Sequence, residues 1–287
     1  MKNNTDNYID LGERGRFSLK NKLNNLTGKE WIKFTKSWFI HRPNRRKEDE
    51  ILHPAKYPES LVAEFIKFFS KENEWVFDPF LGTGSTLIAA GENKRNGIGV
   101  EINEKYFGTC QKRIENLSST QKLLPLLGSS FEIKSILKKN KIEQQIDYTI
   151  TSPPYWNQLE RNNIRQKPRS EKGLDTKYST SKDDLGNEKD YYNFIELQAQ
   201  VFDNVFDITK NKGYLTIITN NVYCEGKLFP LAYDTAISLT KRGKKSWVLK
   251  DEKIWLQDDK SLIALGINNA WIGNRHHQFC LVFRKEE

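Results

Sequence analysis

The chain has 287 residues, of which 37% are hydrophobic and 29% charged, and its formal net charge at pH 7 is +9. The length suits one large domain with a small appendage, the composition excludes a disordered chain, and the charge favours a polyanionic partner such as nucleic acid. The 3 cysteines form no Cys-x-x-Cys pair, no apolar run reaches about 18 residues and the N-terminus lacks the apolar core of a signal peptide, so we expect a cytoplasmic protein without zinc or other metal, disulfide or membrane span.

The first 50 residues predict an N-terminal arm that precedes one domain over residues 51–287. Residues 29–50 interleave aromatic rings with lysines and arginines, a pattern that suits stacking on bases and contact with phosphates. The spacing of Trp31, Phe34 and Trp38 favours instead a helical stripe packed on the domain.

A regular alternation of strands and helices begins at Pro58, which starts an amphipathic helix over 59–70. The following elements are a strand at 75–80, a turn at 81–85, a helix at 85–94, a strand at 96–102, and a helix at 103–117 whose N-cap is Asn103. This βαβα order predicts parallel strands joined by right-handed crossovers.

The same alternation continues almost to the end of the chain, which predicts one doubly wound, mostly parallel α/β sheet of the Rossmann-like kind with helices on both faces. The remaining elements are an apolar run at 123–127, strands at 147–150, 213–219, 247–255 and 279–285, and helices at 190–210 and 230–242. Residues 157–190 show no periodicity, and we interpret this stretch as a substrate-facing loop.

The segment "DPFLGTGST" at 78–86 joins a strand to a helix through Gly82 and Gly84. Two glycines let the backbone turn tightly and approach a ligand closely. No lysine follows the second glycine and Leu87 stands where a dinucleotide fingerprint has its third glycine, so we expect a ligand other than a triphosphate or pyrophosphate. Glu101, at the end of the next strand, is placed to accept hydrogen bonds from ribose hydroxyls.

The segment "TSPPYWN" at 151–157 lies at the end of a third strand, on the edge of the sheet where ligands bind. Pro153 and Pro154 donate no N–H, so the nearby carbonyls are rigid acceptors, and Ser152 adds a hydroxyl. Tyr155 adds a flat ring. Acceptors beside an aromatic face suit a planar group that bears an amino group, such as a nucleobase.

These segments resemble the motifs of the S-adenosylmethionine-dependent DNA amino-methyltransferases, which act on cytosine N4 or adenine N6. "HPAKYPESLVAEFIKFF" is similar to their motif X, "VFDPFLGTGSTLIAA" to motif I, "NGIGVEI" to motif II and "DYTITSPPYWN" to motif IV. The match covers residues 50–160 well, and the C-terminal part more loosely. The motif order X, I, II, IV differs from the large subgroup that has the proline motif first.

The resemblance implies S-adenosyl-L-methionine as cofactor and double-stranded DNA as partner, with the target base flipped out of the duplex. It also implies a restriction-modification or solitary modification enzyme, and leaves open both a cognate endonuclease and the oligomeric state. The implied catalytic residues are Ser152, Pro153, Pro154 and Tyr155; the cofactor-binding residues are His53, Pro54, Lys56, Asp78, Pro79, Phe80, Gly82, Gly84, Ser85, Thr86, Glu101, Ile102 and Ser129; and the candidate DNA-binding residues are Arg42, Arg45, Arg46, Arg161, Arg165, Lys167 and Arg169.

The sequence departs from the family after the third strand, where "GSSF" replaces the acid that often binds the adenine amino group, so either Ser129 or Ser130 substitutes weakly or the contact is missing. None of the cysteines follows a proline, which disfavours cytosine-C5 chemistry. In this family, serine before Pro-Pro-Tyr is more typical of cytosine-N4 enzymes, so we favour that base over adenine N6. Methylation of RNA or of a protein glutamine, and a non-catalytic DNA-binding module, are the alternatives.

Overall fold

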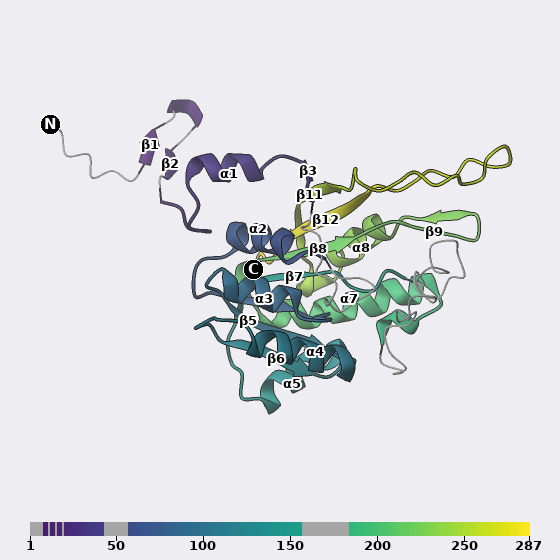
Figure 1. The fold of residues 1–287 in the computed structure, drawn as a ribbon. Helices are drawn as coiled ribbons and strands as arrows, with labels where there is room; N and C mark the ends of the chain where they lie inside the picture. Colours follow the sequence, from purple (N-terminus) through teal and green to yellow (C-terminus); the bar gives the residue numbers. More distant parts are fainter. Residues whose placement is uncertain (1–7, 11, 15, 19, 43–56, 157–183) are drawn as a thin grey trace.

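In the computed structural model, residues 8–10, 12–14, 16–18, 20–42, 57–156 and 184–287 are described. Their centre is one mixed sheet of 8 strands (Figure 1). Strands β3, β11, β12, β8, β7, β4, β5 and β6 follow one another across it. All neighbouring strands are parallel except that β12 runs antiparallel to β11 and β8. The bounds are β3 Trp38–Ile40, β4 Trp75–Asp78, β5 Asn96–Glu101, β6 Leu123–Leu127, β7 Ile146–Thr151, β8 Thr209–Thr219, β11 Val248–Leu256 and β12 His277–Arg284.

Helices cover both faces of this sheet, so the predicted doubly wound α/β fold is confirmed. One face carries α2 (Glu59–Phe69), α3 (Ser85–Glu92) and α4 (Glu104–Glu115), and the other carries α5 (Ile133–Lys139), α7 (Tyr191–Ile208) and α8 (Leu231–Thr240). Within β4 the side chains alternate: Val76 is buried with the α2 face, and its neighbour Phe77 with the α7 face. The period-2 geometry of strands therefore gives each face its own apolar core.

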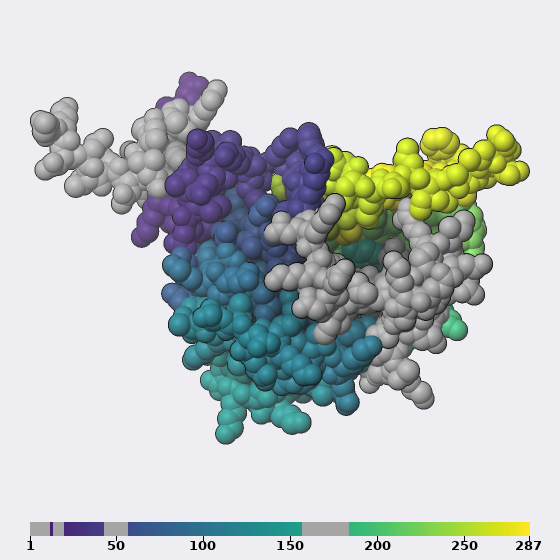
Figure 2. Space-filling model, viewed as in Figure 1, coloured from purple at the N-terminus to yellow at the C-terminus, as the bar shows by residue number. Residues whose placement is uncertain are grey.

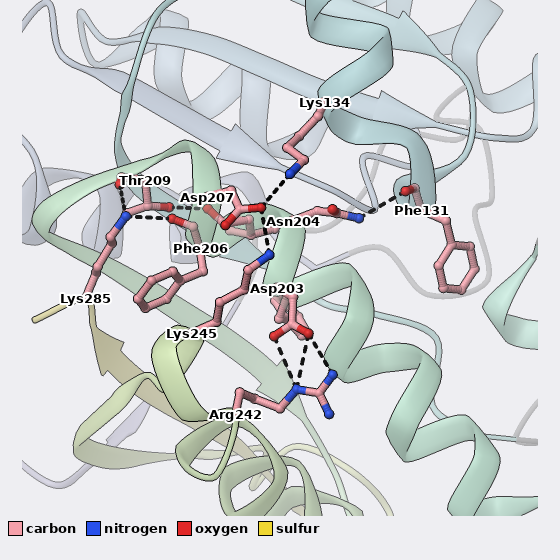
Figure 3. Close-up of polar contacts among 12 residues, drawn as sticks. Phe131, Lys134, Asp203, Asn204, Phe206, Asp207, Thr209, Arg242, Lys245 and Lys285 are labelled. Carbon is pink, nitrogen blue, oxygen red and sulfur yellow. Dashed lines mark hydrogen bonds and ion pairs between the residues drawn. The ribbon is translucent and has the colours of Figure 1, made fainter. Parts of the chain in front are cut away.

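The long helix α7 is fastened to its surroundings by polar contacts as well as by its apolar stripe (Figure 3). Asp203 pairs with the Arg242 guanidinium at 2.6 Å, and Asp207 accepts from both Lys134 and Lys245 at 2.7 and 2.8 Å. At the helix end, the buried Lys285 ammonium donates to two main-chain carbonyls. The bonds of Lys285 satisfy a charged group that burial would otherwise leave unpaired.

Before α2, helix α1 (Gly28–Phe34) packs on the main body through its rings. Trp31 and Phe34 both contact Phe68 of α2, with ring centroids 4.8 and 4.1 Å apart. The prediction that Trp38 continues this helical stripe was wrong, because α1 ends at Phe34 and Trp38 lies on the edge strand β3. Pairing with β11, far along the chain, determines this strand, and local periodicity carries no trace of such a partner.

Two segments project from the sheet on one side (Figures 1 and 2). One is residues 257–276, between β11 and β12; the other is the hairpin of β9 (Val222–Cys224) and β10 (Lys227–Phe229). At the opposite end of the view, β1 (Tyr8–Asp10) and β2 (Arg16–Ser18) pair in a small hairpin of their own. Short 3-10 helices lie at Gly12–Arg14, Ser130–Glu132, Leu185–Asn187 and Gly243–Lys245. None of the helices in the described ranges is long and apolar enough to cross a membrane.

Candidate active site

The glycine turn after β4 has the tight backbone that its sequence predicts. Gly82 and Gly84 both have positive φ, 56° and 88°, and Gly84 is the N-cap of α3. A Cβ at Gly84 would lie 2.4 Å from Cys110 Sγ, so both the backbone angle and the space require glycine there. The turn therefore brings main-chain N–H groups and the start of α3 to the edge of the sheet.

Asp78 ends β4 and lies beneath the turn, completely buried. Its carboxylate accepts from Tyr57 and Thr151 hydroxyls at 2.7 Å each, from the Thr86 hydroxyl, and from the Phe80 N–H at 3.0 Å. Burial raises the pKa of Asp78 above its ordinary value, although these four bonds favour the charged form. Asp78 thus joins the segment before α2, the glycine turn and the end of β7.

Glu101 ends β5, and its two carboxylate oxygens are held by main-chain donors. The Gly82 N–H donates to Oε2 at 2.6 Å and the Asn103 N–H donates to Oε1 at 2.8 Å. Burial raises the pKa of Glu101 to about 7, against the opposing effect of these two bonds. The carboxyl is fixed beside the glycine turn, as the proposed contact with a ribose requires.

The proline segment leaves the end of β7 and forms a second wall. Ser152 Oγ lies 3.2 Å from the Tyr155 hydroxyl, which lies 2.9 Å from Gln278 Oε1 on β12. Burial raises the pKa of Tyr155 above its ordinary value, so this phenol is neutral. The hydroxyl of Tyr155 is therefore anchored in the protein.

Trp156, for which the sequence indicates no role, follows Tyr155 and packs into the protein interior. Its ring is buried among Tyr191 and Phe229, and its Nε1–H donates to the Lys189 carbonyl at 3.0 Å. This packing ties the proline segment to the start of α7, and it explains why a large ring stands at this position.

One cavity lies between the glycine turn, Glu101 and the proline segment. The strand order explains this meeting, because β5, β4 and β7 are adjacent and parallel and therefore end at the same edge. The described residues on its wall are Tyr57, Phe80, Leu81, Gly82, Thr83, Ser85, Glu101, Ile102, Tyr106, Ser130, Ser152, Pro154 and Asp184.

Most of the predicted site residues that are described lie on this wall or directly behind it. Asp78 and Thr86 bond to each other below the cavity. Ser130 faces the cavity and donates to the Pro79 carbonyl, whereas Ser129 caps the short helix that follows, accepting from the Phe131 N–H at 3.3 Å. The predicted site residues that lie outside the described residues are His53, Pro54, Lys56, Arg45, Arg46, Arg161, Arg165, Lys167 and Arg169.

Sequence reasoning missed several wall residues. Tyr57 lies within the segment that resembles motif X, so its place before Pro58 was a usable signal. Tyr106 lies one turn into α4, facing the glycine turn. Asp184 also lies on the cavity wall and follows residues 157–183 in the sequence. No pattern in the sequence around Asp184 points to the cavity.

A mostly parallel sheet with a glycine turn, a strand-end acid and a proline segment around one cavity is the arrangement of the Rossmann-like methyltransferase class. The profile of the DNA methylase family that acts on N6 and N4 amino groups matches residues 3–112 and 146–287. The chain therefore belongs to this family of DNA methylases, and the predicted relationship is confirmed.

Two curated relatives support the relationship over part of the chain. The Type II methyltransferase M.BglI of Bacillus subtilis is 35% identical over 92 residues, 32% of this chain and 26% of that protein. The Type II methyltransferase M.HinfI of Haemophilus influenzae is 33% identical over 121 residues, 42% of this chain and 30% of that protein. The matches thus span less than a third of either relative.

Among solved structures, a putative rRNA-methylase from Clostridium thermocellum is similar, with 14% identity and a TM-score of 0.47 over 80% of this chain and 98% of that chain. Such a likeness says nothing about substrate.

S-adenosyl-L-methionine is the cofactor of this family, and the described residues fit it. The Glu101 carboxyl supplies acceptors for ribose hydroxyls, Gly82 lets the backbone approach, and Phe80 and Tyr106 offer apolar rings.

Proposed function

We propose that this chain is a site-specific DNA methyltransferase that modifies the exocyclic amino group of a base flipped out of the duplex, with cytosine N4 as the favoured target. The observation that carries the proposal is the single cavity on which the glycine turn, Glu101, Ser152 and Pro154 meet. A cofactor subsite and an amino-group subsite share this cavity in a chain of the DNA methylase family.

The cofactor half of the cavity is formed by the glycine turn and β5. The bound cofactor supplies an electrophilic methyl group on a cationic sulfur. Glu101 accepts from the ribose hydroxyls, and its ionised form is better suited to this because both oxygens then only accept. Asp78 supports this half from below, through its bonds to Thr86 and the Phe80 N–H. We assign to Asp78 and Thr86 an indirect part in cofactor binding, because their polar atoms bond to each other.

The proline segment prepares the target amine. The lone pair of an exocyclic amine is delocalised into the base ring, which makes the amine a poor nucleophile. Ser152 Oγ and the Pro153 carbonyl accept the two amino protons and shift electron density back to nitrogen. Tyr155 holds the face of the base with its ring, and positioning supplies most of the acceleration.

The preference for cytosine rests on Ser152 in front of Pro-Pro-Tyr, and adenine N6 is the alternative. We propose that the predicted basic residues contact the DNA. Among the residues that the structure describes, Arg42 is one of them, and its guanidinium pairs with the Asp258 carboxylate at 2.6 Å on the surface. An exposed pair of this kind is worth little, so a DNA phosphate can replace Asp258 as the partner of Arg42. We place the protein in the cytoplasm and regard a partner endonuclease as part of the same hypothesis.

The test is to incubate the protein and methyl-labelled cofactor with varied DNA and, in parallel, with RNA, digest each nucleic acid to nucleosides and identify the labelled product. N4-methylcytosine is expected. N6-methyladenine would overturn the choice of base, and label in RNA alone, or in no nucleoside at all, would overturn the proposed function.

A matched pair of serine variants locates the chemistry. Ser152→Ala removes an acceptor from the cavity and is expected to lower turnover about a hundredfold. Ser135→Ala is the control, because Ser135 lies on α5 with its hydroxyl bonded to the Glu132 carbonyl. Equal activity of the two variants would contradict the role of Ser152.

A further inference from the structure

A chain of hydrogen bonds leads from the cavity into the sheet through the proline segment. Ser152 Oγ, on the wall of the cavity, lies 3.2 Å from the hydroxyl oxygen of Tyr155. That hydroxyl lies 2.9 Å from Gln278 Oε1 on β12 and 3.4 Å from the Ile218 carbonyl on β8. Three segments that are remote in sequence thus converge on one partly buried phenol.

The chemistry of these groups sets the direction of the bonds. Tyr155 has a single hydroxyl proton, and the carbonyls of Gln278 and Ile218 only accept. The tyrosine proton therefore lies on that side, and the tyrosine oxygen has only lone pairs for Ser152. Burial raises the pKa of Tyr155, in agreement with a phenol that keeps its proton for these acceptors.

The direction has a consequence for the cavity. Since Ser152 donates its only proton to Tyr155, its oxygen presents lone pairs alone to a bound base. A free serine would both donate and accept, and would tolerate an amino or a keto group equally. A serine that donates its proton to Tyr155 can accept a hydrogen bond from an amino group. Opposite a keto oxygen, the same serine oxygen is repelled, because both atoms present only lone pairs.

We propose that Gln278 is a positioning residue which, through the Tyr155 hydroxyl, makes Ser152 a dedicated hydrogen-bond acceptor and so selects bases that carry an amino group over bases that carry a keto group. The inference rests on the proposed function and extends it, because it assigns specificity to a residue that never touches the base. It also gives the Tyr155 hydroxyl a task separate from that of its ring.

The first experiment compares turnover and cofactor binding in the wild-type protein and in variants of Gln278 and Ser152. Gln278→Met keeps the length but removes the acceptor, and we expect kcat to fall about tenfold while the calorimetric cofactor Kd is unchanged. Gln278→Glu keeps an acceptor oxygen and is expected to retain turnover within about threefold. In a Ser152→Ala background, Gln278→Met is expected to have no further effect on kcat. The Tyr155 hydroxyl then has no serine hydroxyl whose proton it could hold. Wild-type turnover in Gln278→Met would overturn the role of Gln278, because the Ile218 carbonyl would then suffice as acceptor for the Tyr155 proton. Full additivity with Ser152→Ala would overturn it as well, because the two residues would then act independently.

The second experiment measures specificity on the DNA site found by product analysis. The wild-type protein is expected to bind a duplex with the amino base at least about tenfold more tightly than one with uracil in its place. Tyr155→Phe keeps the ring but frees the Ser152 proton, so it is expected to lose most of that discrimination. Unchanged discrimination in Tyr155→Phe would contradict the proposal even if methylation itself is confirmed.

The direction of the bonds has a readout that needs neither turnover nor DNA. Neutron diffraction from deuterium-exchanged crystals is expected to place the Ser152 deuteron between Oγ and the Tyr155 oxygen. It is expected to place the Tyr155 deuteron toward Gln278 or Ile218. A Ser152 deuteron that points into the cavity would overturn the relay, whatever reaction the protein catalyses, whereas failure of the methylation assay alone would overturn only the proposed function.

Discussion

Replacing Glu101 with glutamine removes a carboxyl that burial keeps protonated up to about pH 7. In the unfolded chain the same carboxyl ionises near its ordinary pKa of 4.5. As the pH rises between these two values, the unfolded state loses this proton and the folded state retains it. The contribution of Glu101 to the free energy of unfolding of the wild-type protein therefore falls over this window and is constant above it.

The magnitude follows from the width of the window. A pKa that moves from 4.5 to about 7 corresponds to about 3 kcal/mol, at about 1.4 kcal/mol for each pKa unit. Glutamine does not ionise, so Glu101→Gln is free of this pH-dependent loss. It does lose one acceptor, since an amide NH₂ then faces either the Gly82 or the Asn103 N–H, and that cost is the same at every pH.

The assay is urea unfolding of both proteins without cofactor, at intervals from pH 4.5 to pH 8. The free energy of unfolding of Glu101→Gln minus that of the wild type is expected to increase by about 3 kcal/mol across the range. Glu115→Gln, which changes an exposed acid at the end of α4, controls for the loss of one charge. A difference that does not change with pH, or that decreases, would refute the reasoning about the buried carboxyl.

Three further predictions concern the same site. Cofactor binding near pH 7 is expected to release a proton from Glu101, because hydroxyl donors favour the charged carboxylate. Calorimetry in two buffers of different ionisation enthalpy measures the number of protons released. A binding enthalpy that does not depend on the buffer would contradict this prediction. Gly84→Ala is expected to cost about 2 kcal/mol or more of stability, because the new methyl group would meet Cys110 Sγ at 2.4 Å and the backbone would be strained. Adding Cys110→Ala should recover only the steric part in urea unfolding, and full recovery would show that the backbone angle costs nothing. Trp156→Ala is expected to cost about 3–5 kcal/mol and Trp156→Phe much less, by the same measurement, and equal losses would indicate that the Lys189 bond outweighs the packing.

Where a signal is local, sequence and structure agree. Asn103 is the N-cap of α4, Pro58 precedes α2, and the glycines after β4 have the positive φ that a tight turn requires. Each of these features is set within a few residues, by a side-chain oxygen that reaches its own backbone or by the absence of a Cβ. Periodicity missed the helix α5 and the strand β3, each shorter than the windows in which a period is recognised.

The sequence was sufficient to predict the alternation of strands and helices and the family. It was also sufficient to predict that the three motifs meet at one edge, because parallel strands in a wound sheet must end on the same side. The fold was needed to show that Asp78 supports the turn from below, that Asp184 faces the cavity, and that Gln278 reaches Tyr155. The Tyr155–Gln278 bond joins residues 123 positions apart, and the bond from Thr151 to Asp78 joins the adjacent strands β7 and β4, so no spacing along the chain encodes them. "TSPPYWN" thus predicts an amino-group site from sequence alone, and the hydrogen bonds behind it are the basis of our proposal that Ser152 is an acceptor.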